Sequence, residues 1–137
     1  MPRFGQNPTM KKNSFDAEVN VERDRRTGAG FYYGSYKFDW DAATKSRVTG
    51  AASLAGFAIG AGAQLDDLRW HSGDTDFVWI LQDNSVLSLD AQGMFEVAQV
   101  AMAHEAAHVF AGRAIKQSET TPVDLRDNAL WPLVEPK

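Results

Sequence analysis

The N-terminal third of the chain carries a hydrophobic pattern of period two. Apolar and polar residues alternate over residues 15–22, which predicts a β-strand with one apolar face. The apolar members of this pattern are Phe15, Ala17, Val19 and Val21. An Asp- and Gly-rich turn follows at 24–30, and the aromatic segment 31–40 can supply the return strand. The pattern therefore predicts an N-terminal β-hairpin.

Two helices are predicted, and each follows an aspartate that can cap its first turn. Asp41 precedes a helix over 42–58, and Asp90 precedes a longer helix over 91–117. On a helical wheel one side of the longer helix is apolar, as defined by Met94, Val97, Ala98, Ala101, Val109 and Ile115. Phe95, Val100 and Phe110 fall outside this stripe. The apolar surface is wider than one packing face requires, which indicates burial on a second side, for example by another subunit.

A second hairpin is predicted between the two helices. Residues 77–81 and 86–89 are rich in β-branched and aromatic side chains, and Asp83-Asn84 forms the turn between them. The expected fold class is therefore α+β, with two packed helices, a β-hairpin between them and the N-terminal hairpin. We expect one domain over residues 15–118.

The two ends of the chain are expected to be extended arms. Residues 1–14 contain two prolines and few large apolar groups, and residues 119–137 contain three prolines and spaced apolar residues. Arms that order on binding need buried apolar anchors, because ordering costs conformational entropy. The expected partner-anchoring residues are Phe4, Val123, Leu125, Leu130, Trp131, Leu133 and Val134.

Composition narrows the function classes. A length of 137 residues favours one domain, and a net charge of −4 argues against a general nucleic-acid binder. The chain has no cysteine, which removes disulfides and thiolate chemistry. The apolar run at 51–63 is too short for a membrane span, and the N-terminus has no apolar core of a signal peptide.

One motif carries potential chemistry. Residues 104–108 read His-Glu-Ala-Ala-His, so His104 and His108 share one face of the predicted helix. Two histidines at this spacing can bind zinc, and Glu105 can act as general base toward a metal-bound water.

Three observations argue against a zinc site. A third protein ligand is required, and the extended form of the motif would place glycine and histidine where Ala111 and Ala114 stand. The remaining acidic candidates lie on the proline-broken tail: Glu119, Asp124, Asp127 and Glu135. The two histidines fall beside the apolar stripe, and the chain lacks the larger sheet of a protease cleft. We therefore expect neutral packing histidines, with no metal, no cofactor and no catalytic residue.

Three further groups of residues are weaker candidates. His71, Asp74 and Asp76 could gather a cation but are more typical of a polar turn. The cluster Arg23, Arg25 and Arg26 could touch phosphate, but a solvated turn or an ion pair with a neighbouring subunit is favoured. The aromatic residues between Phe31 and Trp40 are more typical of a sheet face or subunit interface than of a stacking site.

The order of parts resembles an uncharacterised domain family of tailed bacteriophages and prophages, found in tail-fibre and tail-associated proteins. The residues that carry this resemblance are Gly34–Asp41, Ser46–Ala51, Trp79, Asp83-Asn84, Val86–Leu89 and Arg113–Lys116. It covers about residues 31–118 and extends weakly to Leu125–Pro132. The N-terminal arm and the Gly-rich second half of the first helix depart from the family pattern. The resemblance implies a structural role at the distal tail, with no catalytic residues to carry over.

The resulting hypothesis is a structural component of a phage tail, at the distal tail or the fibre attachment. It would be made in the bacterial cytoplasm, reside in the virion, and dock onto copies of itself and onto other tail or fibre proteins, without nucleic acid or a membrane span. One alternative is a tail-fibre assembly chaperone. The other is a small zinc-dependent hydrolase that uses His104, His108 and Glu105.

Overall fold

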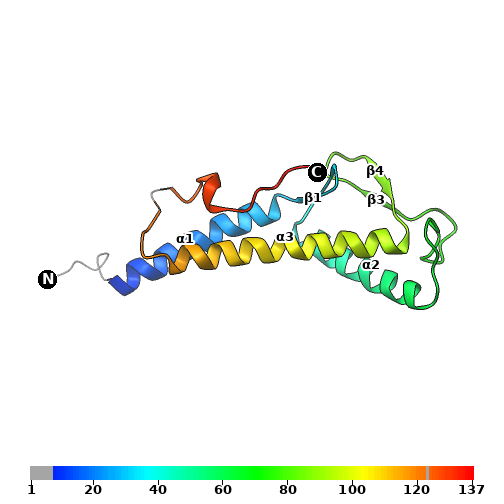
Figure 1. Ribbon diagram of the computed structural model, residues 1–137, viewed down its shortest axis with the longest axis horizontal. Helices are drawn as coiled ribbons and strands as arrows, with labels where there is room; N and C mark the ends of the chain where they lie inside the picture. The colour runs from blue at the N-terminus through cyan, green and yellow to red at the C-terminus, as the bar shows by residue number, and fades with distance from the viewer. Residues whose placement is uncertain (1–7, 123) are drawn as a thin grey trace.

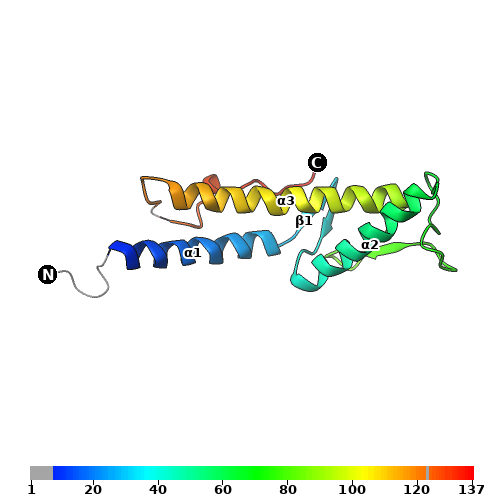
Figure 2. The same cartoon turned by 90° about the horizontal axis from the view of Figure 1, so that it is seen from below.

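The computed structural model of the chain describes residues 8–122 and 124–137. Three helices dominate the molecule: α1 (Pro8–Gly28), α2 (Ala42–Gly60) and α3 (Ala91–Gln117). Figures 1 and 2 show an elongated molecule in which α3 is the spine. Helices α1 and α2 lie end to end along one side of α3, and both run antiparallel to it. The α+β fold class is confirmed.

Helix α1 corrects two sequence expectations. Residues 15–22 are helical rather than a strand, and residues 8–14 of the expected extended arm belong to the same helix. The side chains that α1 turns inward follow the helical period, since Val19 is fully buried and Glu22 is 6% exposed, whereas Val21 is 69% exposed. Ion pairs at helical spacing, Lys12 with Asp16 among them, add to the helix.

The N-terminal hairpin exists, but both of its strands come from the aromatic segment. Strand β1 (Phe31–Tyr33) pairs antiparallel with β2 (Tyr36–Phe38), and Phe31 stands opposite Phe38. Their rings stack at 5.2 Å. The residues expected to form the preceding turn continue α1 as far as Gly28.

The connection into β1 depends on a glycine. Gly30 has φ +112°, and a Cβ at this position would lie 2.4 Å from the carbonyl oxygen of Phe38. Only glycine adopts this backbone conformation without strain and leaves room for the neighbouring strand. Gly30 therefore fixes where the chain turns out of α1.

The central elements match their sequence predictions. Asp41 caps α2 by accepting the backbone N–H of Thr44 at 3.2 Å, and Asp90 caps α3 by accepting that of Gly93 at 2.7 Å. Between them β3 (Val78–Ile80) pairs antiparallel with β4 (Val86–Ser88), with Asn84 in the left-handed region of the turn. The hairpin between two packed helices is confirmed.

The buried residues form two clusters along α3. The larger cluster joins α2, α3 and both hairpins, and includes Phe31, Phe38, Trp40, Trp70, Leu89, Met94 and Val97. The smaller cluster joins α1, α3 and the C-terminal segment through Val19, Ile115 and Trp131. Val109, expected in the packed stripe of α3, is instead 46% exposed, because α1 and α2 cover only a narrow seam of the helix.

The C-terminal segment folds back along α1 and α3 (Figure 1). It contains one short 3-10 turn, η2 (Asn128–Leu130), and otherwise has no regular structure in residues 118–122 and 124–137. Its end lies beside the first hairpin, where the backbone N–H of Lys137 donates to Gly34 at 3.0 Å. No helix in the described ranges is long and apolar enough to cross a membrane.

Candidate functional site

The side of α3 that faces away from α1 and α2 exposes several large apolar side chains. We call it the α3 outer face; Figure 2 shows that α1 and α2 both lie on one side of α3. Its apolar members are Phe95, Val100, Met102, Ala103, Ala106, Ala107, Val109, Phe110 and Ala114, and the exposed polar residue Gln99 lies among them. Met102 is 56% exposed and Phe110 is 66% exposed. Exposed apolar patches of this kind mark interaction surfaces.

The α3 outer face carries no charge between Glu96 and Arg113. The only ionisable residues in this interval are His104, Glu105 and His108, and all three make contacts on the opposite side of the helix. A solvated helix face is normally rich in charged residues. The uncharged surface agrees with the sequence observation that the apolar part of this helix is wider than one packing face requires.

The two histidines of the His-Glu-Ala-Ala-His segment pack inside the molecule. The His104 Nε2–H donates to the carbonyl oxygen of Thr27 at 2.9 Å, and His108 Nδ1–H donates to the carbonyl oxygen of His104 at 2.8 Å. His108 is only 1% exposed. Burial lowers the pKa of His104, which favours the neutral ring. The hydrogen bond to Thr27 uses the His104 nitrogen that a zinc site of this motif would need.

Glu105, the residue expected to act as a base in a zinc site, has two partners from other elements. Its carboxylate accepts the indole N–H of Trp40 at 2.8 Å and lies 3.2 Å from the ammonium of Lys45. Within the described residues no group of three potential ligands gathers that could hold a metal ion. His71, Asp74 and Asp76, the weaker candidate for a cation site, likewise form no such group, and Asp76 pairs with Arg69.

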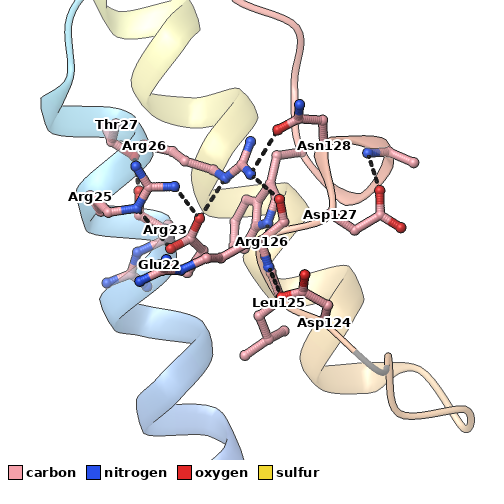
Figure 3. A network of polar contacts seen from close by, with 12 residues as sticks. Glu22, Arg23, Arg25, Arg26, Thr27, Asp124, Leu125, Arg126, Asp127 and Asn128 are labelled. Atoms are coloured by element: carbon pink, nitrogen blue, oxygen red, sulfur yellow. Dashed lines mark hydrogen bonds and ion pairs between the residues drawn. The ribbon is translucent and has the colours of Figure 1, made fainter.

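A polar network joins the end of α1 to the C-terminal segment (Figure 3). The buried carboxylate of Glu22 accepts hydrogen bonds from Arg25 at 2.5 and 2.9 Å and from Arg26 at 2.8 Å. The hydrogen bond from Arg25, with that from Arg26, lowers the pKa of Glu22 to about 2. Burial acts in the opposite direction and is outweighed. Glu22 is therefore a buried anion at neutral pH.

Arg26 extends this network across the chain. It donates to the carbonyl oxygen of Arg126 at 2.7 Å and to the side chain of Asn128 at 3.0 Å. The arginine cluster found in the sequence is thus paired within its own chain, since Arg23 also binds Asp24 and Asn20. These contacts correct the expectation of a solvated turn or an intersubunit ion pair.

The structure corrects the assignment of three expected partner anchors. Trp131 is 6% exposed and packs against Val19 and Ile115, while Leu125 and Leu130 pack around the same cluster. The Trp131 indole N–H donates to the Leu125 carbonyl at 2.8 Å. These side chains anchor the segment to its own molecule, because α1 and α3 already present an apolar seam there.

The other expected anchors have different positions. Leu133 is 79% exposed and Val134 is half-buried, so Leu133 remains free for a partner. Phe4 and Val123 lie outside the described residues. The aromatic residues that were expected on a sheet face are mostly core, and Tyr33 donates its hydroxyl to Glu96 at 2.7 Å.

Sequence reasoning missed Glu22 as an organising residue. The signal was present as a glutamate three and four positions before two arginines, the spacing of neighbours on a helix. A strand assignment over 15–22 hides this spacing, because on a strand residues three apart point to opposite faces and residues four apart are too far apart along the chain to share one carboxylate.

Residues 10–128 match the model of a family described as "Domain of unknown function (DUF4376)". No curated protein and no solved structure matches the chain.

Proposed function

We propose that this chain, which belongs to the DUF4376 family, is a structural component of a bacteriophage tail that acts by protein–protein docking. The tail assignment is supported by the sequence resemblance over residues 31–118. Docking is supported by one structural observation, the uncharged and exposed α3 outer face. The proposed occupant of this face is a second copy of the chain.

The residue spacing on the α3 outer face suits a helix–helix contact between copies. Phe95, Met102 and Val109 are seven residues apart, and Ala106 lies between the last two on the same side. Apolar residues at this interval keep one stripe in register along two packed helices. Alanines permit close approach of the backbones, and two identical faces without charge do not repel each other.

Large apolar side chains are exposed along the length of this face, from Phe95, which is 40% exposed, to Phe110, which is 66% exposed. Exposed aromatic and aliphatic side chains of this kind supply the buried core of an interface. Figure 2 shows that α3 is long and straight, so a second helix could pack along it.

Sedimentation velocity on the full chain tests this proposal. The wild-type chain is expected to form a dimer at micromolar concentration, and the double variant Met102→Glu, Phe110→Glu is expected to be monomeric. Phe57→Glu is the matched control, because Phe57 is an exposed apolar residue of α2 outside the α3 outer face. A wild-type chain that stays monomeric at 100 times this concentration would refute pairing through α3.

The phage-tail assignment needs a separate experiment. Mass spectrometry of purified virions is expected to find the chain in stoichiometric amounts with the tail proteins. Its presence during assembly but absence from finished particles would instead support the assembly chaperone. Its absence at both stages would refute the tail assignment.

A further inference from the structure

A cleft of about 340 Å³ lies between the end of α1, the first hairpin and the C-terminal segment. We call it the basic cleft. The residues that matter for its chemistry are Arg25 and Arg26 on α1, Lys37 on β2 and His108 on α3. No carboxylate side chain is among the described residues that line it. Glu22, which lies outside this lining, pairs with both arginines, so three cationic side chains stand against a single carboxylate.

Lys37 is the cation with the fewest contacts. Its ammonium makes no ion pair and no hydrogen bond to any described residue, and it lies 4.4 Å from the ring centroid of Tyr32. The side chain is half-buried, and its Cε stands next to Gly30 in the cleft wall. A partly desolvated ammonium without a carboxylate is a strong attractor for an anion.

The two arginines have N–H groups to spare. Arg25 uses Nε and Nη2 on Glu22, and Arg26 uses Nε on Glu22 and Nη2 on the C-terminal segment. A guanidinium has five N–H donors, so each arginine retains donors on Nη1. Glu22 and the C-terminal segment hold both side chains in place, which prepares these donors for a ligand.

His108 supplies a buried polar group in the wall of the same cleft. It is 1% exposed, and its Nδ1–H is committed to the carbonyl of His104. Nε2 makes no hydrogen bond to any residue in the described ranges and is the ring nitrogen left for the cleft. Nε2 is therefore available as a hydrogen-bond acceptor for a ligand in the cleft.

We infer that the basic cleft is a binding site for a phosphoryl group. Hydrogen phosphate and phosphate monoesters carry oxyanion oxygens that accept from Lys37, Arg25 and Arg26. Inorganic hydrogen phosphate also carries a P–OH at neutral pH that can donate to Nε2 of His108, whereas a monoester, with a second pKa of about 6, can do so only in its monoanionic form. A carboxylate has no such proton and would direct a lone pair at a lone pair. The cleft exceeds the size of free phosphate and suits a small monoester.

Isothermal titration calorimetry with the full chain tests this inference. Inorganic phosphate and glycerol 3-phosphate are the two probes, and sulfate is the comparison anion because it has no proton to donate at neutral pH. Both probes are expected to bind with 1:1 stoichiometry, and sulfate at least tenfold more weakly. Tighter binding of glycerol 3-phosphate assigns the site to a monoester, and equal binding assigns it to free phosphate.

Lys37→Gln is expected to weaken phosphate binding at least tenfold. The matched control is Lys11→Gln, which removes one exposed charge from α1 far from the cleft and should leave the affinity unchanged. Circular dichroism checks that both variants keep their helices. The inference is overturned if neither probe binds, if sulfate binds equally well, or if both variants lose affinity equally. Its outcome is independent of the self-association experiment, which concerns the opposite side of α3.

Discussion

The guanidinium of Arg26 lies 5.7 Å from the ring centroid of Trp131, so that a residue of α1 covers the aromatic anchor of the C-terminal segment. The same guanidinium binds the Arg126 carbonyl, 100 positions away in the sequence. One side chain therefore combines a cation–π contact with hydrogen bonds to a distant segment. Arg26 therefore adds polar and cation–π contacts to the apolar packing that holds the C-terminal segment.

Arg26→Ala should release the C-terminal segment and lower the free energy of unfolding by about 2 to 4 kcal/mol, the scale of lost charged hydrogen bonds plus a cation–π contact. Urea unfolding measures the loss, and limited proteolysis should show new cleavage after Lys116 or Arg126. Arg47→Ala is the control, because Arg47 is an exposed arginine of α2, and its replacement should change stability by less than ~0.5 kcal/mol. Equal stability of the two variants would contradict this role.

The ionised Glu22 is expected to contribute to the free energy of unfolding at neutral pH and to lose this contribution in acid. Its pKa of about 2 in the folded chain lies below the ordinary value of 4.5, so the ionised form is stabilised by folding. The contribution is complete above pH 5, reaches up to about 3 kcal/mol, and is lost as the pH falls from 5 towards 2. Urea unfolding at several pH values should show a shallower acid loss for Glu22→Gln. The exposed Glu18→Gln should retain the wild-type profile.

Substitution by alanine is expected to change the free energy of unfolding in opposite directions at Gly30 and at Gly28. Gly30→Ala should lower the free energy of unfolding by ~2 kcal/mol or more, because the new Cβ meets Phe38 and the positive φ is strained. Gly28→Ala places a Cβ in open space at the end of α1 and should stabilise the helix by ~0.5 kcal/mol. Thermal unfolding of the two variants provides the comparison, and a loss of equal size in both would contradict the role of Gly30.

The elements from α2 to α3 could be predicted because their signals are local. An aspartate before each helix and an Asp-Asn turn between two β-branched segments determine these boundaries within a few residues. None of these signals depends on what the element later packs against.

Helix α1 could not be predicted from the same kind of evidence. The alternation at 15–22 has period two, yet the side chains at 15, 19, 22 and 26 also form a helical stripe. The choice between the two periods is made by tertiary packing, because α3 offers a long apolar seam on which a helix can lie.

The candidate sites could likewise be predicted only in part, since some of their features are local in sequence and others depend on tertiary packing. The excess apolar surface of α3 was visible in the sequence, since it follows from composition along one helix. The burial of Trp131 in its own molecule could not be predicted, because an apolar residue in a proline-rich tail can pack equally well on its own molecule or on a partner. Likewise, the basic cleft draws on α1, β2 and α3, and only the fold brings these segments together.

Helix α3 contributes residues to two separate clusters of buried residues, and this division has a consequence for dynamics. The larger cluster joins elements that follow one another closely in the sequence, whereas the smaller one must close the loop between the two ends of the chain. We therefore expect amide hydrogen exchange to resolve two cooperative units, with α1 and the C-terminal segment opening first. The molecule could then loosen one end while the α2 half of its spine stays folded.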